Sequence, residues 1–87
     1  WLMAGINRNI RGIPAWLMGE YLQEMGGTAA GDSRYTHPQW SATVQQIEDY
    51  QLGALRVGQI QFLVEIEDEA LPHFQKRLDL KLLRGGG

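Results

Sequence analysis

The sequence contains no cysteine, no long apolar run and no excess of basic residues. The absence of cysteine excludes disulfides, thiolate zinc sites and a cysteine nucleophile, and it fits the reducing environment of the cytoplasm. Eight lysines and arginines stand against ten aspartates and glutamates, so nonspecific binding to nucleic-acid phosphates is not expected. No apolar run approaches the ~20 residues that a membrane-spanning helix requires. We therefore expect a cytoplasmic protein that binds neither nucleic acid nor membrane.

The 87 residues, of which 44% are hydrophobic, are enough for one compact domain and too few for two. A domain of this size buries roughly 60–65% of the surface that its unfolded chain exposes, which leaves a narrow margin of stability. The first residue is Trp1 and not a start methionine. We expect residues 1–4 to be the remnant of a longer chain or disordered, residues 5–84 to form a single domain, and residues 85–87 to form a glycine tail.

The first third of the chain predicts a strand followed by a helix. Residues 6–12 alternate weakly and indicate a short strand at a sheet edge. Pro14 suits the first position of a helix, and Gly26 with Gly27 supplies the left-handed residue that ends one. Gly19, inside the helix, suggests a close backbone approach. The predicted apolar stripe consists of Pro14, Leu17, Met18, Tyr21, Leu22 and Met25.

The middle of the chain predicts antiparallel strands. Residues 28–33 are expected to form a loop, residues 34–38 a short strand and residues 40–50 a longer one, with a turn over residues 49–53.

The apolar residues of the next segment change phase. Leu55 and Val57 have odd numbers, whereas the apolar residues from Ile60 to Ile66 have even ones, so one flat strand cannot bury both sets on one face. A type II′ turn at Gly58-Gln59 would explain the change, and we favour it over a bulge at Gly58.

The last predicted element is an amphipathic helix. Asp68 is expected to cap it and Glu69 to lie in its first turn. Its apolar stripe consists of Leu71, Phe74, Leu78 and Leu82. Two amphipathic helices need one apolar surface to cover, so we predict an α+β fold in which both pack on one face of a curved antiparallel sheet, in the order β-α-β(4)-α.

No set of residues predicts an active site, so we expect a protein that is not an enzyme and has no catalytic, cofactor-binding or metal-binding residues. His37 and His73 lack the close spacing of metal ligands and are expected to be ordinary surface histidines. A run of carboxylates is explained by the wet face of a strand followed by a helix cap, and it consists of Glu65, Glu67, Asp68 and Glu69.

Two features suggest contact with a partner. Trp16 lies off the apolar stripe of the first helix, so it either forms part of a partner surface or flanks the edge of the core. The sequence also ends in Arg84, Gly85, Gly86 and Gly87. Such a tail is thin enough to enter an activating enzyme, although glycines after a helix are also the commonest signal that ends one.

Three stretches together resemble the C-terminal domain of MoaD-related proteins, a domain of unknown function. They are "IPAWLMGEYLQEMGGT", "YQLGALRVGQIQFLVEIE" and "LKLLRGGG", and the resemblance runs from about Gly5 to Gly87. Its most specific part is the Pro-x-Trp-Leu-x-x-x-Tyr-Leu-x-x-x-Gly-Gly-Thr pattern from Pro14 to Thr28. The resemblance implies a TBP-like fold, that is, a curved antiparallel sheet with helices on one face.

The resemblance also implies a function. In two-domain relatives a ubiquitin-like sulfur carrier comes first, and the domain that follows would mask, release or guide it. The leading hypothesis is therefore a noncatalytic accessory or interaction domain linked to molybdopterin-cofactor or sulfur-carrier biochemistry. Its expected partner is a MoaD-type ubiquitin-like domain or the enzyme that activates one. The alternative is a small carrier protein that is itself activated at the carboxylate of Gly87.

Overall fold

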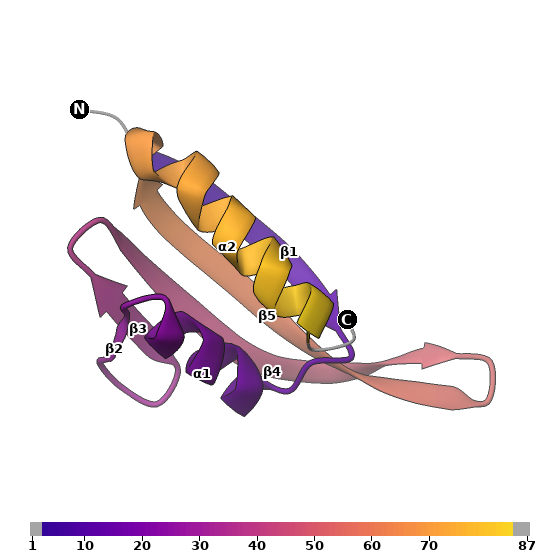
Figure 1. Cartoon of the computed structure of the whole chain (residues 1–87). Helices are drawn as coiled ribbons and strands as arrows, with labels where there is room; N and C mark the ends of the chain where they lie inside the picture. The colour runs from indigo at the N-terminus through magenta and orange to yellow at the C-terminus, as the bar shows by residue number, and fades with distance from the viewer. Residues whose placement is uncertain (1–2, 85–87) are drawn as a thin grey trace.

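The computed structural model describes residues 3–84, which form a five-stranded antiparallel sheet and two α-helices (Figure 1). The elements are β1 (Met3–Arg11), α1 (Ala15–Glu24), β2 (Thr28–Ala29), β3 (Arg34–His37), β4 (Trp40–Leu52), β5 (Leu55–Glu67), the 3-10 turn η1 (Asp68–Ala70) and α2 (Leu71–Arg84). The strands lie in the order β1-β5-β4-β3-β2. The predicted α+β class and the predicted order of elements are confirmed.

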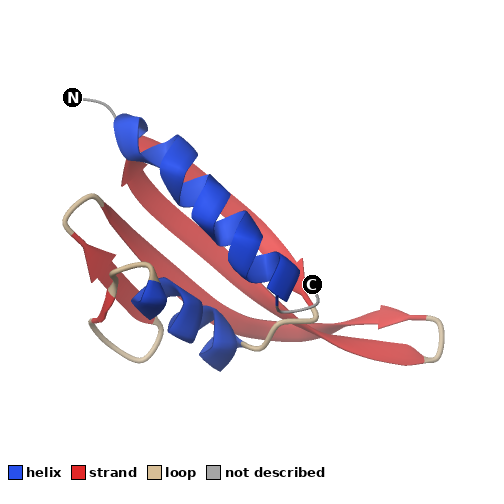
Figure 2. Cartoon of the chain, viewed as in Figure 1, coloured by secondary structure: helices blue, strands red, loops and turns tan. Residues whose placement is uncertain are grey.

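Both helices cover the same face of the sheet (Figure 2). Even-numbered side chains of β4 and β5 point toward the helices and join the helix residues in one core cluster. Each large side chain buried there stabilises the fold by about 1.5–3 kcal/mol. The core of these elements consists of Trp40, Ala42, Val44, Ile60, Phe62, Val64 and Ile66 from the sheet and Met18, Tyr21, Leu22, Met25, Phe74 and Leu78 from the helices.

The first helix begins one residue later than expected. Pro14 has an extended backbone and is the N-cap, so α1 starts at Ala15. Pro14 has no side-chain hydrogen-bonding group, and the Ala15 N–H instead donates to Oε1 of Gln46 at 3.2 Å. The helix ends as predicted, because Gly26 has the left-handed φ of +99°.

The predicted turn at Gly58-Gln59 is wrong. β5 runs without interruption from Leu55 to Glu67, and Gly58 does not have the positive φ that a type II′ turn requires at its first central position. The chain turns earlier, after Leu52, where Gly53 has a φ of +61°. The irregularity in the pairing lies in β4, between Ile47 and Tyr50, and not at Gly58. Four strands still lie between the two helices in the sequence, as predicted. Thr28–Ala29, expected to be loop, forms β2 and replaces the strand that the wrong turn had added.

The change of phase in β5 marks two faces of one strand. Leu55 and Val57 are odd-numbered and therefore point away from the helices, opposite to Ile60. They pair directly with Leu52 and Tyr50 of β4, so the four side chains share one face. We call residues 48–58 the ribbon and these four side chains its apolar face. The ribbon projects beyond both helices (Figure 1).

The second helix also differs from the prediction at its start. Asp68 does not cap it, because residues 68–70 form a 3-10 turn that leads into α2 at Leu71, and the residue before that turn makes no side-chain cap bond. Phe74 and Leu78 enter the core as the periodicity predicts.

β1 is an edge strand, as expected, and it begins at Met3 and not at Ile6. Met3 and Ala4 pair with Glu67 and Ile66 of β5. Within residues 3–84, neither helix combines the length and the apolarity that crossing a bilayer demands.

Candidate functional site

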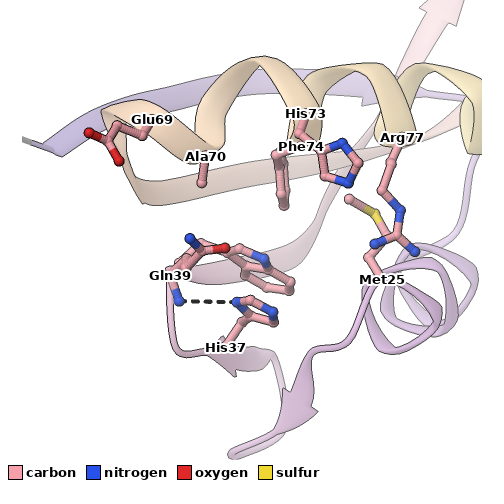
Figure 3. A pocket seen from close by; sticks show the side chains of 9 residues that line it. Met25, His37, Gln39, Glu69, Ala70, His73, Phe74 and Arg77 are labelled. Atoms are coloured by element: carbon pink, nitrogen blue, oxygen red, sulfur yellow. Dashed lines mark hydrogen bonds between the residues drawn. The ribbon is translucent and has the colours of Figure 1, made fainter.

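An open pocket of about 360 Å³ lies where the end of α1, the turn between β3 and β4, and the first turns of α2 meet (Figure 3). Its residues come from distant parts of the sequence, and the fold brings them together. They are Met25, His37, Gln39, Trp40, Glu69, Ala70, His73, Phe74 and Arg77.

The apolar part of the pocket is built around Trp40. The indole stacks on the His37 ring with a centroid distance of 5.2 Å and an interplanar angle of 4°. It also meets the edge of the Phe74 ring at 5.2 Å. Gly27 leaves room for this arrangement, because a Cβ there would lie 2.6 Å from Cη2 of Trp40. The indole is therefore held in place from several sides.

His37 has a defined orientation at the pocket. Its Nδ1 accepts a hydrogen bond of 3.0 Å from the backbone N–H of Gln39, across the turn between β3 and β4. The proton of the neutral ring is therefore on Nε2. That nitrogen lies beside Gly26, where a Cβ would be only 3.4 Å away, so the glycine leaves this edge of the ring uncovered.

The opposite wall carries basic side chains of α2. His73, Arg77 and Lys81 follow one another at intervals of four residues and so lie on one side of the helix. Nη2 of Arg77 donates to the backbone carbonyl of Glu24 at 3.2 Å, and Lys81 forms an ion pair with the Glu24 carboxylate. Glu24 ends α1, where the partial negative charge of that helix is concentrated. The basic row thus ties α2 to the carbonyl end of α1.

The two histidines are the residues whose grouping the sequence analysis missed. They are 36 positions apart, and no local pattern links a residue at the end of a short strand to one on a helix. The interval of four residues between His73 and Arg77 was visible in the sequence. The approach of His37 depends on the stacking of Trp40 between two layers.

The carboxylate run does not form a cluster for chemistry. Glu69 lines the pocket, whereas the odd-numbered Glu65 of β5 lies on the face of the sheet away from the helices. Within residues 3–84, no three His, Asp or Glu side chains are grouped so that they could hold a metal ion.

The two predicted partner features lie elsewhere. Trp16 is on α1 with 66% of its surface exposed, and it does not line the pocket. Arg84 is the last residue of α2, and Gly85, Gly86 and Gly87 lie outside the described residues. The chain therefore reaches its glycines from a helix, with no strand between them.

A comparison with models of protein families shows the family to which the chain belongs. The model of the archaeal MoaD-like protein family matches residues 6–87. The chain belongs to this family. The match covers all three stretches that carried the resemblance to MoaD-related proteins, and that prediction is confirmed. A search of curated proteins finds no match to this MoaD-like chain.

Proposed function

We propose that this MoaD-like chain is a noncatalytic accessory domain that binds a protein partner in cytoplasmic sulfur-carrier or molybdopterin-cofactor biochemistry. The observation that carries the proposal is the apolar face of the ribbon. Leu52 and Leu55 are 59% and 66% exposed, and no helix covers them. Aromatic and aliphatic side chains gathered on a projecting element are typical of a surface that a partner covers.

The construction of the ribbon supports this role. A two-stranded ribbon alone is only marginally stable in water. Its base is held by the guanidinium of Arg11, which lies 3.4 Å above the centre of the Tyr50 ring, and by the Gln59 side-chain amide, which donates to the Glu48 carbonyl at 3.3 Å. The tip has no support from a second layer, and a bound partner would provide it.

Family membership supports the kind of partner. The proposed partner is a MoaD-type ubiquitin-like domain or the enzyme that activates one. The exposed indole of Trp16 is proposed as a separate contact, because α1 lies on the face of the sheet opposite to the apolar face of the ribbon (Figure 2).

The test replaces the two exposed leucines together. Leu52→Ser with Leu55→Ser should weaken binding to the MoaD-type partner at least tenfold in calorimetry, because loss of two apolar anchors costs several kcal/mol. The matched control is Gln51→Ser with Arg56→Ser, which alters the paired residues on the opposite face of the same ribbon. Equal binding by both double variants would refute the ribbon as the interface. Trp16→Ala, measured in the same way, tests whether α1 takes part.

The alternative function is a carrier activated at Gly87, and it is supported by the terminal Arg-Gly-Gly-Gly sequence. Incubation with a MoaD-activating or ubiquitin-activating enzyme and ATP should then convert the Gly87 carboxylate to an acyl-adenylate with release of pyrophosphate. When a sulfide donor is added, sulfur should displace AMP to give a thiocarboxylate, and intact-mass measurement detects either product. An unchanged mass, together with full partner binding by a chain that ends at Arg84, would reject the carrier function. The accessory function would then be the one that remains.

A further inference from the structure

We infer that the pocket between α1 and α2 binds a small oxyanion, of the phosphate or carboxylate type. This inference goes beyond the proposed function and does not depend on it, since the ribbon and the pocket are separate surfaces.

The pocket has a higher share of basic side chains than the chain as a whole. The sequence has a formal net charge of −2, yet the pocket is lined by one guanidinium, two imidazoles and one carboxylate. Figure 3 shows the side chains of His73 and Arg77 next to each other, with His37 across the gap and the Glu69 carboxylate at the far end of the pocket. The side near Arg77 is therefore rich in hydrogen-bond donors.

Arg77 is held in position for this role. Its hydrogen bond of 3.2 Å to the Glu24 carbonyl holds the guanidinium at the pocket. A guanidinium has five N–H donors, so this bond leaves others available. The planar fork of arginine matches two oxygens of a phosphate or carboxylate.

The surrounding charges favour an anion. The partial positive charge at the start of α2 lies at the Glu69 end of the pocket, where it offsets that carboxylate. The carbonyl end of α1 is also close, but the Glu24 carbonyl accepts a bond from Arg77 and the Glu24 carboxylate is paired with Lys81. The indole of Trp40 and the ring of Phe74 form an apolar floor that lowers the local dielectric and strengthens hydrogen bonds at the rim.

A purely structural role for the basic side chains of α2, His73, Arg77 and Lys81, makes a different prediction. If Arg77 serves only to join the helices, its replacement changes stability and nothing else. The exposed His73 separates the two cases, because it lines the pocket and takes part in neither of the two bonds described above between α2 and Glu24.

The experiment is an NMR titration of the full chain with inorganic phosphate and, separately, with acetate, at constant ionic strength. Saturable shifts are expected for the Gln39 amide and the Trp40 indole N–H. His73→Gln should weaken binding several-fold and Arg77→Gln at least tenfold. Lys76→Gln, which removes an exposed charge of α2 that does not line the pocket, should bind as the unaltered chain does. Preference for phosphate would identify a tetrahedral ligand, and preference for acetate a planar carboxylate.

Two outcomes would overturn the inference. One is the absence of saturable shifts with either anion. The other is unchanged affinity in His73→Gln and Arg77→Gln, each shown to be folded by thermal unfolding. The variants with substituted Leu52 and Leu55 should retain anion binding, so the two proposals succeed or fail separately.

Discussion

Single glycines allow the helix α1 to approach aromatic rings of the sheet. A Cβ on Gly19 would overlap the hydroxyl of Tyr35, so the close contact at this position is with a side chain, whereas the sequence suggested a close backbone approach. A Cβ on Gly27 would lie 2.6 Å from Cη2 of Trp40 and 2.9 Å from the backbone oxygen of Leu22. The second contact involves backbone, which cannot move aside as a side chain can.

Gly27→Ala should therefore lower the free energy of unfolding by about 1–3 kcal/mol, the usual cost of overpacking a filled site. Chemical denaturation measures the change. The matched control is Gly58→Ala, where a Cβ would meet only Nε2 of Gln46 at 3.8 Å and φ is not positive. We expect that variant to differ from the unaltered chain by less than about 0.5 kcal/mol. A large loss in Gly58→Ala would contradict a continuous β5.

Individual side chains also limited what the sequence could predict about the site. His37 and His73 were expected to be unrelated surface residues, because an imidazole carries no sign of its spatial neighbours. The stacking of His37 on Trp40 depends on the register between β3 and β4, which pairs these two residues directly. His37 and Trp40 flank the two-residue connection Pro38-Gln39, and the loop length of a hairpin fixes its register. No such local link brings His73 of α2 to the same pocket.

Among the elements, α1 depends on a neighbouring strand for its start. Pro14 gives no side-chain cap. Gln46 of β4 instead accepts a hydrogen bond at the start of the helix, and it makes a second bond to β5. Its Oε1 accepts from the Ala15 N–H at 3.2 Å, and its Nε2 donates to the Gln59 carbonyl at 3.0 Å. One side chain thus links the helix to both long strands.

Gln46→Ala should cost about 1 kcal/mol of stability, which is typical of a lost helix cap. Gln45→Ala is the control, since the adjacent side chain points to the other face of β4 and is exposed. Thermal unfolding of the two variants gives the comparison. Equal midpoints would show that the cap from Gln46 contributes nothing.

At the level of elements, the periodic patterns predicted the helices and the core face of β5 correctly. They failed at the ribbon for a physical reason. An alternating pattern says which side chains share a face, but not whether that face is covered. Leu55 and Val57 were assigned to a second strand because burial was assumed for every apolar residue, whereas the structure leaves Leu55 exposed on the far side.

In the molecule as a whole, support is distributed unevenly along the two long strands. From about residue 60 to residue 66, β5 has a paired strand on each side, and its even-numbered side chains enter the core beneath the helices. Among residues 3–84, β4 and β5 pair only with each other beyond the base of the ribbon. The molecule measures 47 × 25 × 21 Å and is elongated along this pair.

Hydrogen exchange should follow this division. The amides of Ile60, Phe62 and Val64 should exchange only on global unfolding, whereas those of Leu52 and Arg56 should exchange orders of magnitude faster through local opening. Exchange read by NMR gives each rate. Comparable protection of both groups in the isolated chain would show that the ribbon is stable without a partner.

The antiparallel pairing of β1 with β5 has a consequence during synthesis. Met3 lies opposite Glu67 and Arg11 opposite Gln59, so the paired residues of β1 and β5 are 48 to 64 positions apart in the sequence. Contacts so distant in sequence close slowly, because the intervening chain must first be ordered. On the ribosome, β1 therefore leaves the exit tunnel long before β5. In that interval the backbone of β1 is open to pairing with other nascent chains.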